Sequence, residues 1–311
     1  ISLGGGGAVA LAGLVCALTP SLAVLIGARF VQGLFIPALT TCLAAYLAKT
    51  LPVARLNVVM GSYVAATVLG GLGGRLLGGW IHPPLHWRYA FVSASAFILI
   101  ATAAALRWLP RAPVAPGGRT GTVGFLTLLR RWELVRLYLC AAGSFALFSS
   151  VFNYLPFRLA EPAFGFSTEL TTLVYLVYVI GIFMGPTAGR ISNRVGTGAI
   201  LLAGVAVLAG SLLVILIPAP AAVVAGLVGI CTGFFSVHAG AVGALNRKLS
   251  EGQGRANALY VLFYYGGGWL GITAAGFAYH HAGWSAVVYL GLCLLLVPLG
   301  AGIGERRGRQ R

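Results

Sequence analysis

The stretch of sequence that decides the fold is VGTGAILLAGVAVLAGSLLVILIPAPAAVVAGLVGICTGFFSVHAGAVGALN, residues 195–246. It contains no Asp, Glu, Lys or Arg, and residues 256–304 contain none either. Each stretch is about twice as long as the roughly 20 residues that a helix needs to cross the hydrocarbon core of a bilayer. Turn residues interrupt both stretches near the middle, at 218–220 (Pro-Ala-Pro) and at 280–283 (His-His-Ala-Gly). The sequence therefore predicts two hairpins of membrane-spanning helices.

The rest of the chain is nearly as apolar as these hairpins. Of 311 residues, 59% are hydrophobic and 8% are charged, and the mean hydropathy is +0.93. A soluble domain carries about 25% charged residues, so lipid must be the solvent for much of this chain. The apolar runs are continuous and lack the alternation of a barrel strand, and a helix satisfies its own backbone groups in lipid. We therefore expect an all-α, polytopic membrane protein.

Ten spans are predicted, at residues 1–19, 21–47, 57–81, 88–107, 134–157, 168–189, 197–217, 221–246, 256–279 and 284–303. The basic residues test this assignment. Seventeen of the 21 Lys and Arg residues lie in or beside the loops after the even-numbered spans, whereas Arg88 and Arg158 lie on the other side. This asymmetry follows the positive-inside rule, so both the start of the chain and its C-terminus are expected in the cytoplasm. The expected location is the bacterial inner (plasma) membrane.

One long polar connection divides the predicted spans. Residues 110–132 are rich in Pro, Gly and Arg and are expected to form a cytoplasmic linker between a four-span bundle, 1–109, and a six-span bundle with a basic tail, 133–311. A shift of 200 residues places Arg55-Leu56-Asn57 on Arg255-Ala256-Asn257 and Gly33 on Gly233. Weak repeats of this kind are typical of transporters built from two related halves. Because the first half has two spans fewer, we expect that two preceding spans are missing from this chain.

Several local motifs resemble those of the major facilitator superfamily, whose members have twelve spans in two six-helix halves. Residues 28–33 (ARFVQG) are similar to the R-x-x-Q-G motif of the fourth helix of this family. Residues 189–196 (GRISNRVG) are similar to the cytoplasmic loop motif G-x-x-x-D-R-x-G, with Asn193 where Asp is usual. Residues 263–268 (FYYGGG) look like the eleventh helix of bacterial efflux members. The resemblance covers the whole chain and implies a secondary transporter that contains family helices three to twelve.

A further motif resembles the fifth-helix signature of drug–proton antiporters, at Gly61 and Gly70. Gly71 stands where this signature usually has Pro, and Arg75 stands where it usually has the last Gly. The resemblance thus suggests export by antiport with protons.

Four residues are candidates for coupling because they place polar groups inside spans, where a charge costs a few kcal/mol unless it has water or a partner. Arg29, with Gln32 of the same motif, is expected to act in proton coupling, as the resemblance implies; the alternative is a side chain that reaches the interface or bonds to backbone carbonyls. No span contains an internal Asp or Glu, so a carboxylate partner would lie in the missing helices. Arg75 lies near the outer end of its span, where reaching the interface is easy. His238 is the only mid-span histidine and suits proton exchange, although a buried neutral histidine bonded to another helix is the more common case.

Aromatic residues recur at helical spacing and are candidates for lining a cavity that accepts a lipophilic cation through cation–π contact. The alternative is that they pack between helices or face lipid. The candidate cavity residues are Phe148, Asn153, Tyr260, Tyr264, Tyr265 and Trp269.

Glycine runs inside the spans are expected to allow close packing of helices and bending during transport. Together with the loop motif, the residues expected to serve gating or packing are Gly33, Gly70, Gly71, Gly74, Gly189, Asn193, Arg194 and Gly196.

Other functional classes are disfavoured. The net charge of +16 is explained by loop topology, which argues against nucleic-acid binding. The sequence contains neither H-E-x-x-H nor G-x-S-x-G nor an acid pair, and its five cysteines have no metal or redox spacing, so we expect no enzyme activity, no cofactor and no metal site. The favoured function is proton-coupled efflux of a small lipophilic or amphiphilic solute by one copy of the chain in the lipid bilayer. A sugar or metabolite carrier stays open, as does a non-transporting membrane fragment or packing subunit.

Overall fold

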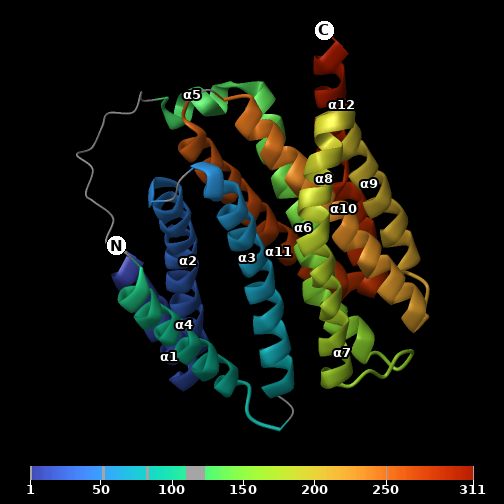
Figure 1. The fold of residues 1–311 in the computed structure, drawn as a ribbon. Coiled ribbons are helices and arrows are strands. Elements are labelled where there is room, and N and C mark those ends of the chain that lie inside the picture. The colour runs from blue at the N-terminus through green and yellow to red at the C-terminus, as the bar shows by residue number, and fades with distance from the viewer. Residues whose placement is uncertain (1, 51–52, 82–83, 110–122, 250, 311) are drawn as a thin grey trace. The chain divides into compact units, whose positions relative to one another are not determined.

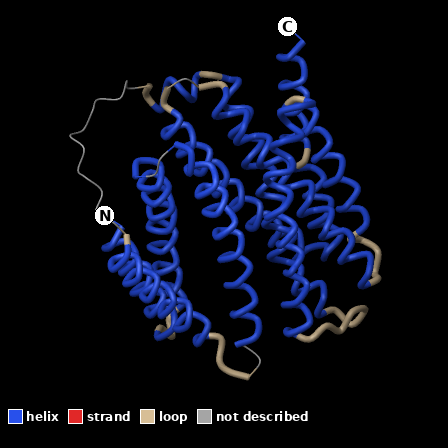
Figure 2. Tube along the Cα trace, viewed as in Figure 1, coloured by secondary structure: helices blue, strands red, loops and turns tan. Residues whose placement is uncertain are grey.

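The computed structural model describes residues 2–50, 53–81, 84–109, 123–249 and 251–310. Helices account for nearly all of these residues, and Figure 2 shows helices joined by short loops, with no strand in the described ranges. The prediction of an all-α protein is confirmed. Contacts divide the chain into two compact units, Ile1–Gly118 and Arg119–Arg311, which are described separately. The division falls within the predicted linker, whose residues 110–122 lie outside the described ranges.

Unit 1 consists of four helices, α1 (Ser2–Leu18), α2 (Leu22–Thr50), α3 (Val53–Ile81) and α4 (Arg88–Trp108). Unit 2 consists of α5 (Phe125–Arg130), α6 (Trp132–Ala160), α7 (Thr168–Val174), the 3-10 helix η1 (Tyr175–Val179), α8 (Ile180–Val195), α9 (Thr197–Val214), α10 (Pro220–Arg247), α11 (Gln253–Leu294) and α12 (Leu296–Gln310). Figure 1 labels these helices in chain order.

Each predicted span coincides with helix. Among the described residues, seven segments are long and apolar enough to cross a membrane, and Gly4–Leu18 is a shorter apolar helix. The last of the seven, Gln253–Gly308, contains both the ninth and the tenth predicted span. These two spans are separated inside α11, where the backbone leaves the helical conformation at Ala282 and at Gly283, whose φ is +65°.

One local feature adds to the prediction, and another shows how a predicted span is built. The short helix α5 lies within the stretch 110–132 that was predicted as a linker, and Arg255 Nη1 of α11 donates a hydrogen bond to the Val123 carbonyl just before it, at 2.9 Å. The predicted span 168–189 is one continuous helical path made of α7, η1 and α8. Ser167 begins this path by accepting a hydrogen bond from the Leu170 amide at 3.3 Å, as an N-cap serine does.

The closest interhelical packing of unit 2 joins α6 and α11 through glycines. A Cβ added at Gly267 would lie 2.4 Å from the Ala142 carbonyl oxygen, and one added at Gly271 would lie 2.6 Å from the Ala146 Cα atom. Both contacts are with backbone, which cannot move aside as a side chain can. In a bilayer, small residues drive helix association because they let helix backbones touch.

The two units use the same helix arrangement at positions related by the sequence repeat. In unit 1, α1 packs against α2 and α4; in unit 2, α9 packs against α10 and α12. Figure 1 shows α9 and α10 side by side. A side chain from a later helical segment also bonds to the end of α1 and of α9. Arg88 Nη2, at the start of α4, donates to the Thr19 carbonyl at 2.9 Å, and Trp284 Nε1, just after the kink of α11, donates to the Ile215 carbonyl at 3.2 Å.

The α6–α11 contact gives a matched test. Gly267→Ala adds a methyl group against the backbone of α6, whereas no described atom lies within 4 Å of a Cβ added at Gly266. Overpacking of this kind costs about 1–3 kcal/mol, while alanine in an open helical position gains up to about 1 kcal/mol over glycine. Thermal unfolding of the purified protein in detergent should therefore give a lower midpoint for Gly267→Ala and an unchanged or higher midpoint for Gly266→Ala. Equal midpoints for the two variants would contradict the packing described.

Candidate functional site

Arg29 has a neutral partner within its own helix. Its Nη1 atom donates to Gln32 Oε1 at 2.9 Å, and its guanidinium carbon lies 5.7 Å from the centre of the Phe91 ring on α4. Gln32 is 7% exposed, and its Nε2 atom donates to the Val9 carbonyl of α1 at 3.1 Å. The R-x-x-Q-G motif therefore ties α2 to α1 through Gln32 and holds an exposed arginine next to that joint.

Arg75 lies on α3 and bonds to its own helix, since its Nη1 atom is 3.4 Å from the Gly71 carbonyl oxygen. This contact is with a backbone carbonyl one turn earlier in the same helix. Its assignment as a coupling residue stays a prediction.

His238 of α10 forms a polar pair with α11. Its Nδ1 atom lies 3.0 Å from the Tyr260 hydroxyl, and Tyr260 is only 3% exposed. The histidine ring is also parallel to the Phe234 ring, with centres 5.9 Å apart, and lies 5.3 Å from the Tyr264 ring. Sequence reasoning named His238 and Tyr260 for separate reasons, and the structure brings them together.

Aromatic rings from α6, α10 and α11 surround this pair. Phe145 stacks on Tyr264 with ring centres 3.8 Å apart, and Phe148 stacks on Phe234 at 4.1 Å. Phe148 is 4% exposed, so it packs inside unit 2, whereas Phe145 and Tyr264 are half-buried. We call the set Phe145, Phe148, Phe234, His238, Tyr260 and Tyr264 the aromatic cluster.

The remaining cavity candidates lie at the exposed surface of unit 2. Tyr265 is 53% exposed and meets the Phe145 ring edge-on at 5.9 Å, so it borders the aromatic cluster. Trp269 is 68% exposed. Asn153 is exposed and donates from Nδ2 to the Ser149 carbonyl of its own helix at 2.7 Å. Of these three candidates, Tyr265 is the one that contacts the aromatic cluster.

The predicted packing glycines of unit 1 have open space beside them. No described atom lies within 4 Å of a Cβ built at Gly33, Gly70, Gly71 or Gly74. Close contacts are found at other glycines of unit 1, such as Gly6 and Gly13 against α4, and in the second glycine run, 266–268 of α11, at Gly267 and Gly268 against α6. Sequence reasoning treated the two runs as equivalent because composition alone does not reveal which helix face a glycine occupies.

The loop motif at 189–196 forms the joint between α8 and α9. Gly196 has a φ of +94°, a conformation that favours glycine, and no described atom lies within 4 Å of a Cβ at Gly189. Asn193 Oδ1 accepts from Arg247 Nη1 of α10 at 3.4 Å. Arg194 is exposed. The motif therefore connects the α8–α9 joint to the end of α10.

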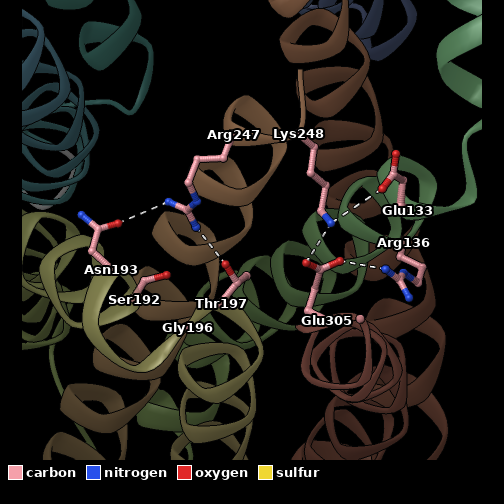
Figure 3. A pocket seen from close by; sticks show the side chains of 10 residues that line it. Glu133, Arg136, Ser192, Asn193, Gly196, Thr197, Arg247, Lys248 and Glu305 are labelled. Atoms are coloured by element: carbon pink, nitrogen blue, oxygen red, sulfur yellow. Dashed lines mark hydrogen bonds and ion pairs between the residues drawn. The ribbon is translucent and has the colours of Figure 1, made fainter. Parts of the chain in front are cut away.

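Sequence reasoning missed a charged pocket beside this joint, shown in Figure 3. Glu305 of α12 pairs with Arg136 of α6 at 2.8 Å and with Lys248 at 3.2 Å, and Lys248 also lies 3.8 Å from Glu133. The paired residues are 57, 115 and 169 positions apart in sequence, so no local spacing could have revealed the set.

Comparisons with known proteins agree with this architecture. The sequence model of the Major Facilitator Superfamily matches residues 1–249. The chain is 27% identical over 292 residues to "Uncharacterized MFS-type transporter YybF" of Bacillus subtilis (strain 168), covering 92% of this chain and 72% of that protein. It is 26% identical over 287 residues to "Inner membrane transport protein YnfM" of Escherichia coli (strain K12), covering 91% of this chain and 68% of that protein.

A solved structure has the same fold. It is a bacterial homolog of the human lysosomal transporter Spinster in an inward-facing and occupied conformation, and it superposes with a TM-score of 0.73 at 11% identity, over 99% of this chain and 82% of that one. The matched family model covers far more than half of the chain, and the helical arrangement is that of transporters of the same family. The chain belongs to the Major Facilitator Superfamily, and it is a polytopic, all-α membrane transporter protein of the secondary-transport class.

Proposed function

We propose that the protein exports a small lipophilic or amphiphilic cation in exchange for protons, by alternating access. The observation that carries this proposal is the aromatic cluster of unit 2. The rings of its half-buried members Phe145 and Tyr264 are stacked, and the exposed ring of Tyr265 lies edge-on beside Phe145. Aromatic faces attract cations by about 0.5–2 kcal/mol each, and the attraction is strongest away from water.

A polar solute fits this face less well. A sugar needs several side-chain donors and acceptors, because a buried hydroxyl without a partner is costly. Two hydroxyl groups next to the cluster are already bonded within the protein: Ser149 Oγ donates to the Phe145 carbonyl at 2.6 Å, and the Tyr260 hydroxyl pairs with His238. We therefore favour a lipophilic solute over a sugar or metabolite.

His238 is the proposed proton carrier of unit 2. The chain contains five acidic residues, at 133, 161, 169, 251 and 305, all near span ends, so histidine is the group at mid-span that can exchange a proton near neutral pH. Its bond to Tyr260 links α10 to α11, so protonation of the ring would change a contact between two helices. In unit 1, the exposed Arg29 is the proposed second coupling residue, held by Gln32.

We also propose that residues 1–109 correspond to family helices three to six and 133–311 to helices seven to twelve. The shared contact pattern, α1 with α2 and α4 and α9 with α10 and α12, supports this assignment.

The proposed function predicts coupled flux. Protein reconstituted in liposomes should move protons, followed with an entrapped pH-sensitive dye, when a lipophilic cation such as tetraphenylphosphonium is added. Tyr264→Leu removes a stacked ring and should lower the rate about tenfold, the effect of a lost contact of about 1.4 kcal/mol. Phe277→Leu is the matched control, since Phe277 is 67% exposed on the same helix and lies outside the aromatic cluster. Equal rates for the two variants would remove the cluster from the transport path.

Coupling is tested separately from solute recognition. His238→Gln keeps a polar group but cannot carry a proton near neutral pH, so this variant should still bind tetraphenylphosphonium while proton flux falls to the level of empty liposomes. Arg29→Ala should have the same effect on flux. If both variants pump protons at the wild-type rate, proton coupling through these residues is wrong. If the wild-type protein shows no proton flux with tetraphenylphosphonium or any other lipophilic cation tested, a metabolite carrier or a non-transporting role becomes the favoured function.

The proposed topology, with the C-terminus in the cytoplasm, is tested by labelling. Pro218 lies in the loop before α10 and Gln253 at the start of α11, and both are exposed. In a background without the native cysteines, an impermeant maleimide should label Pro218→Cys in intact cells but not Gln253→Cys, and inverted vesicles should give the reverse. Labelling of Gln253→Cys in intact cells would invert the topology.

A further inference from the structure

The cations on one side of the charged pocket have carboxylate partners within the protein, and the cation on the other side has none. The pocket has a volume of about 440 Å³ and is formed by the ends of α6, α8, α9, α10 and α12 (Figure 3). On the first side, Glu305 pairs with Arg136 and with Lys248. Glu133 pairs with Arg131, outside the pocket lining, and lies 3.8 Å from Lys248.

On the other side, Arg247 has only neutral partners. Its Nη2 atom donates to Thr197 Oγ1 at 2.8 Å, and its Nη1 atom lies 3.4 Å from Asn193 Oδ1. Within the described ranges, no ion pair includes Arg247. A guanidinium group has five donors in a planar fork that matches a carboxylate or phosphate, so Arg247 retains capacity for an anion.

A buried hydroxyl lies beside this arginine. Ser192 is 3% exposed, it lines the pocket, and its Oγ atom has no hydrogen-bond partner among the described residues. Figure 3 draws it between Asn193 and Thr197. Buried polar side chains nearly always have a partner, so an orphaned hydroxyl in a pocket wall is an independent indication of a ligand.

The start of α9 adds a third source of positive potential. Gly196 precedes the helix with a φ of +94° and provides no side-chain cap, and both Gly196 and Thr197 line the pocket. The first amides of a helix have no partner within it, and the helix dipole places partial positive charge at this end. Since α9 has 18 residues, its dipole is fully developed.

We propose that Arg247, Ser192, Thr197 and the start of α9 bind a phosphate group. A tetrahedral oxyanion has more acceptor sites than a carboxylate and matches a guanidinium fork, a hydroxyl group and helix amides that converge from different elements. The group can belong to a phospholipid of the adjacent leaflet or to a soluble phosphate, since both offer the same oxygens. This site lies apart from the aromatic cluster and goes beyond the proposed transport function.

Asn193 makes the proposal specific to this chain. The resembling family motif usually has Asp at this position, and a carboxylate 3.4 Å from Arg247 would neutralise the guanidinium group. With asparagine there, the charge of Arg247 is free for an external anion. Asn193→Asp should therefore weaken anion binding, because the introduced carboxylate would itself pair with Arg247.

The experiment measures binding to the delipidated protein in neutral detergent, as the shift of the thermal midpoint. One arm titrates inorganic phosphate, and a second adds phosphatidylglycerol in mixed micelles. Arg247→Gln and Asn193→Asp should each weaken binding roughly tenfold or more, the effect of one charge-assisted hydrogen bond. Arg190→Gln is the matched control, because Arg190 is an exposed arginine of α8 that does not line the pocket, and its affinity should stay within twofold of wild type.

The two arms identify the source of the phosphate group. A response in the lipid arm alone assigns a lipid headgroup, a response in the phosphate arm alone assigns a soluble anion, and either supports the site. Without any anion, Asn193→Asp should unfold at or above the wild-type midpoint, because the new carboxylate pairs with Arg247. The proposal is overturned if neither arm responds, if both pocket variants bind as tightly as wild type, or if Asn193→Asp is less stable than wild type in the absence of anion.

Discussion

Many serine and threonine hydroxyl groups inside the spans of this protein bond back to their own helices. Ser150 Oγ donates to the Ala146 carbonyl at 2.6 Å, and Thr172 Oγ1 donates to the Thr168 carbonyl at 2.6 Å. The same bond to the carbonyl four residues earlier is made by Thr187, Thr232, Ser236 and Thr273. Hydrocarbon offers no partner to a polar group, so each group must find one in the protein, and this requirement governs the rest of the structure. Because of this requirement, the spans are helical and few charged residues lie in their middle parts. Small residues then allow the helices to pack closely.

The same constraint separates two kinds of chemistry along the helices of unit 2. At the depth of the spans the interacting groups are aromatic, and the pair of His238 with Tyr260 is enclosed by rings from α6, α10 and α11. At the end of the bundle, where α12 meets α6, ionised groups gather and balance one another around Glu305. Placing an ionised group within the hydrocarbon core costs much more free energy than placing it at the membrane interface. The proposed solute site, the aromatic cluster, and the proposed anion site, the charged pocket, therefore lie at different depths of unit 2.

Much of the fold could be predicted because it follows from local sequence. The uncharged stretches at 195–246 and 256–304 fix two helical hairpins, and the turn residues Pro218 and Gly283 mark where each reverses. Pro220 opens α10, as expected of proline in a first helical turn. The short helix α5 was missed because six residues within a Pro- and Gly-rich connection carry too little periodicity to be recognised.

The sites could be predicted only in part, because they depend on which helix faces which. The sequence pointed to His238, Tyr260 and Tyr264 as separate candidates, but their grouping needs the register of α10 against α11. For the same reason the charged pocket was not foreseen, since Arg136 and Glu305 are 169 positions apart. Glycine positions show the limit most clearly: Gly74 and Gly267 lie in similar runs, yet only Gly267 touches another backbone.

The most direct test of the account is to locate the bound solute. A lipophilic cation carrying a photoreactive diazirine would be crosslinked to the protein in membranes, and labelled peptides would be mapped by mass spectrometry with and without excess unlabelled cation. The account predicts competed labelling within 145–152 of α6, 234–238 of α10 and 260–265 of α11, the segments that supply the aromatic cluster. Competed labelling that maps instead to exposed positions such as Phe183 and Phe277, and spares these three segments, would contradict it.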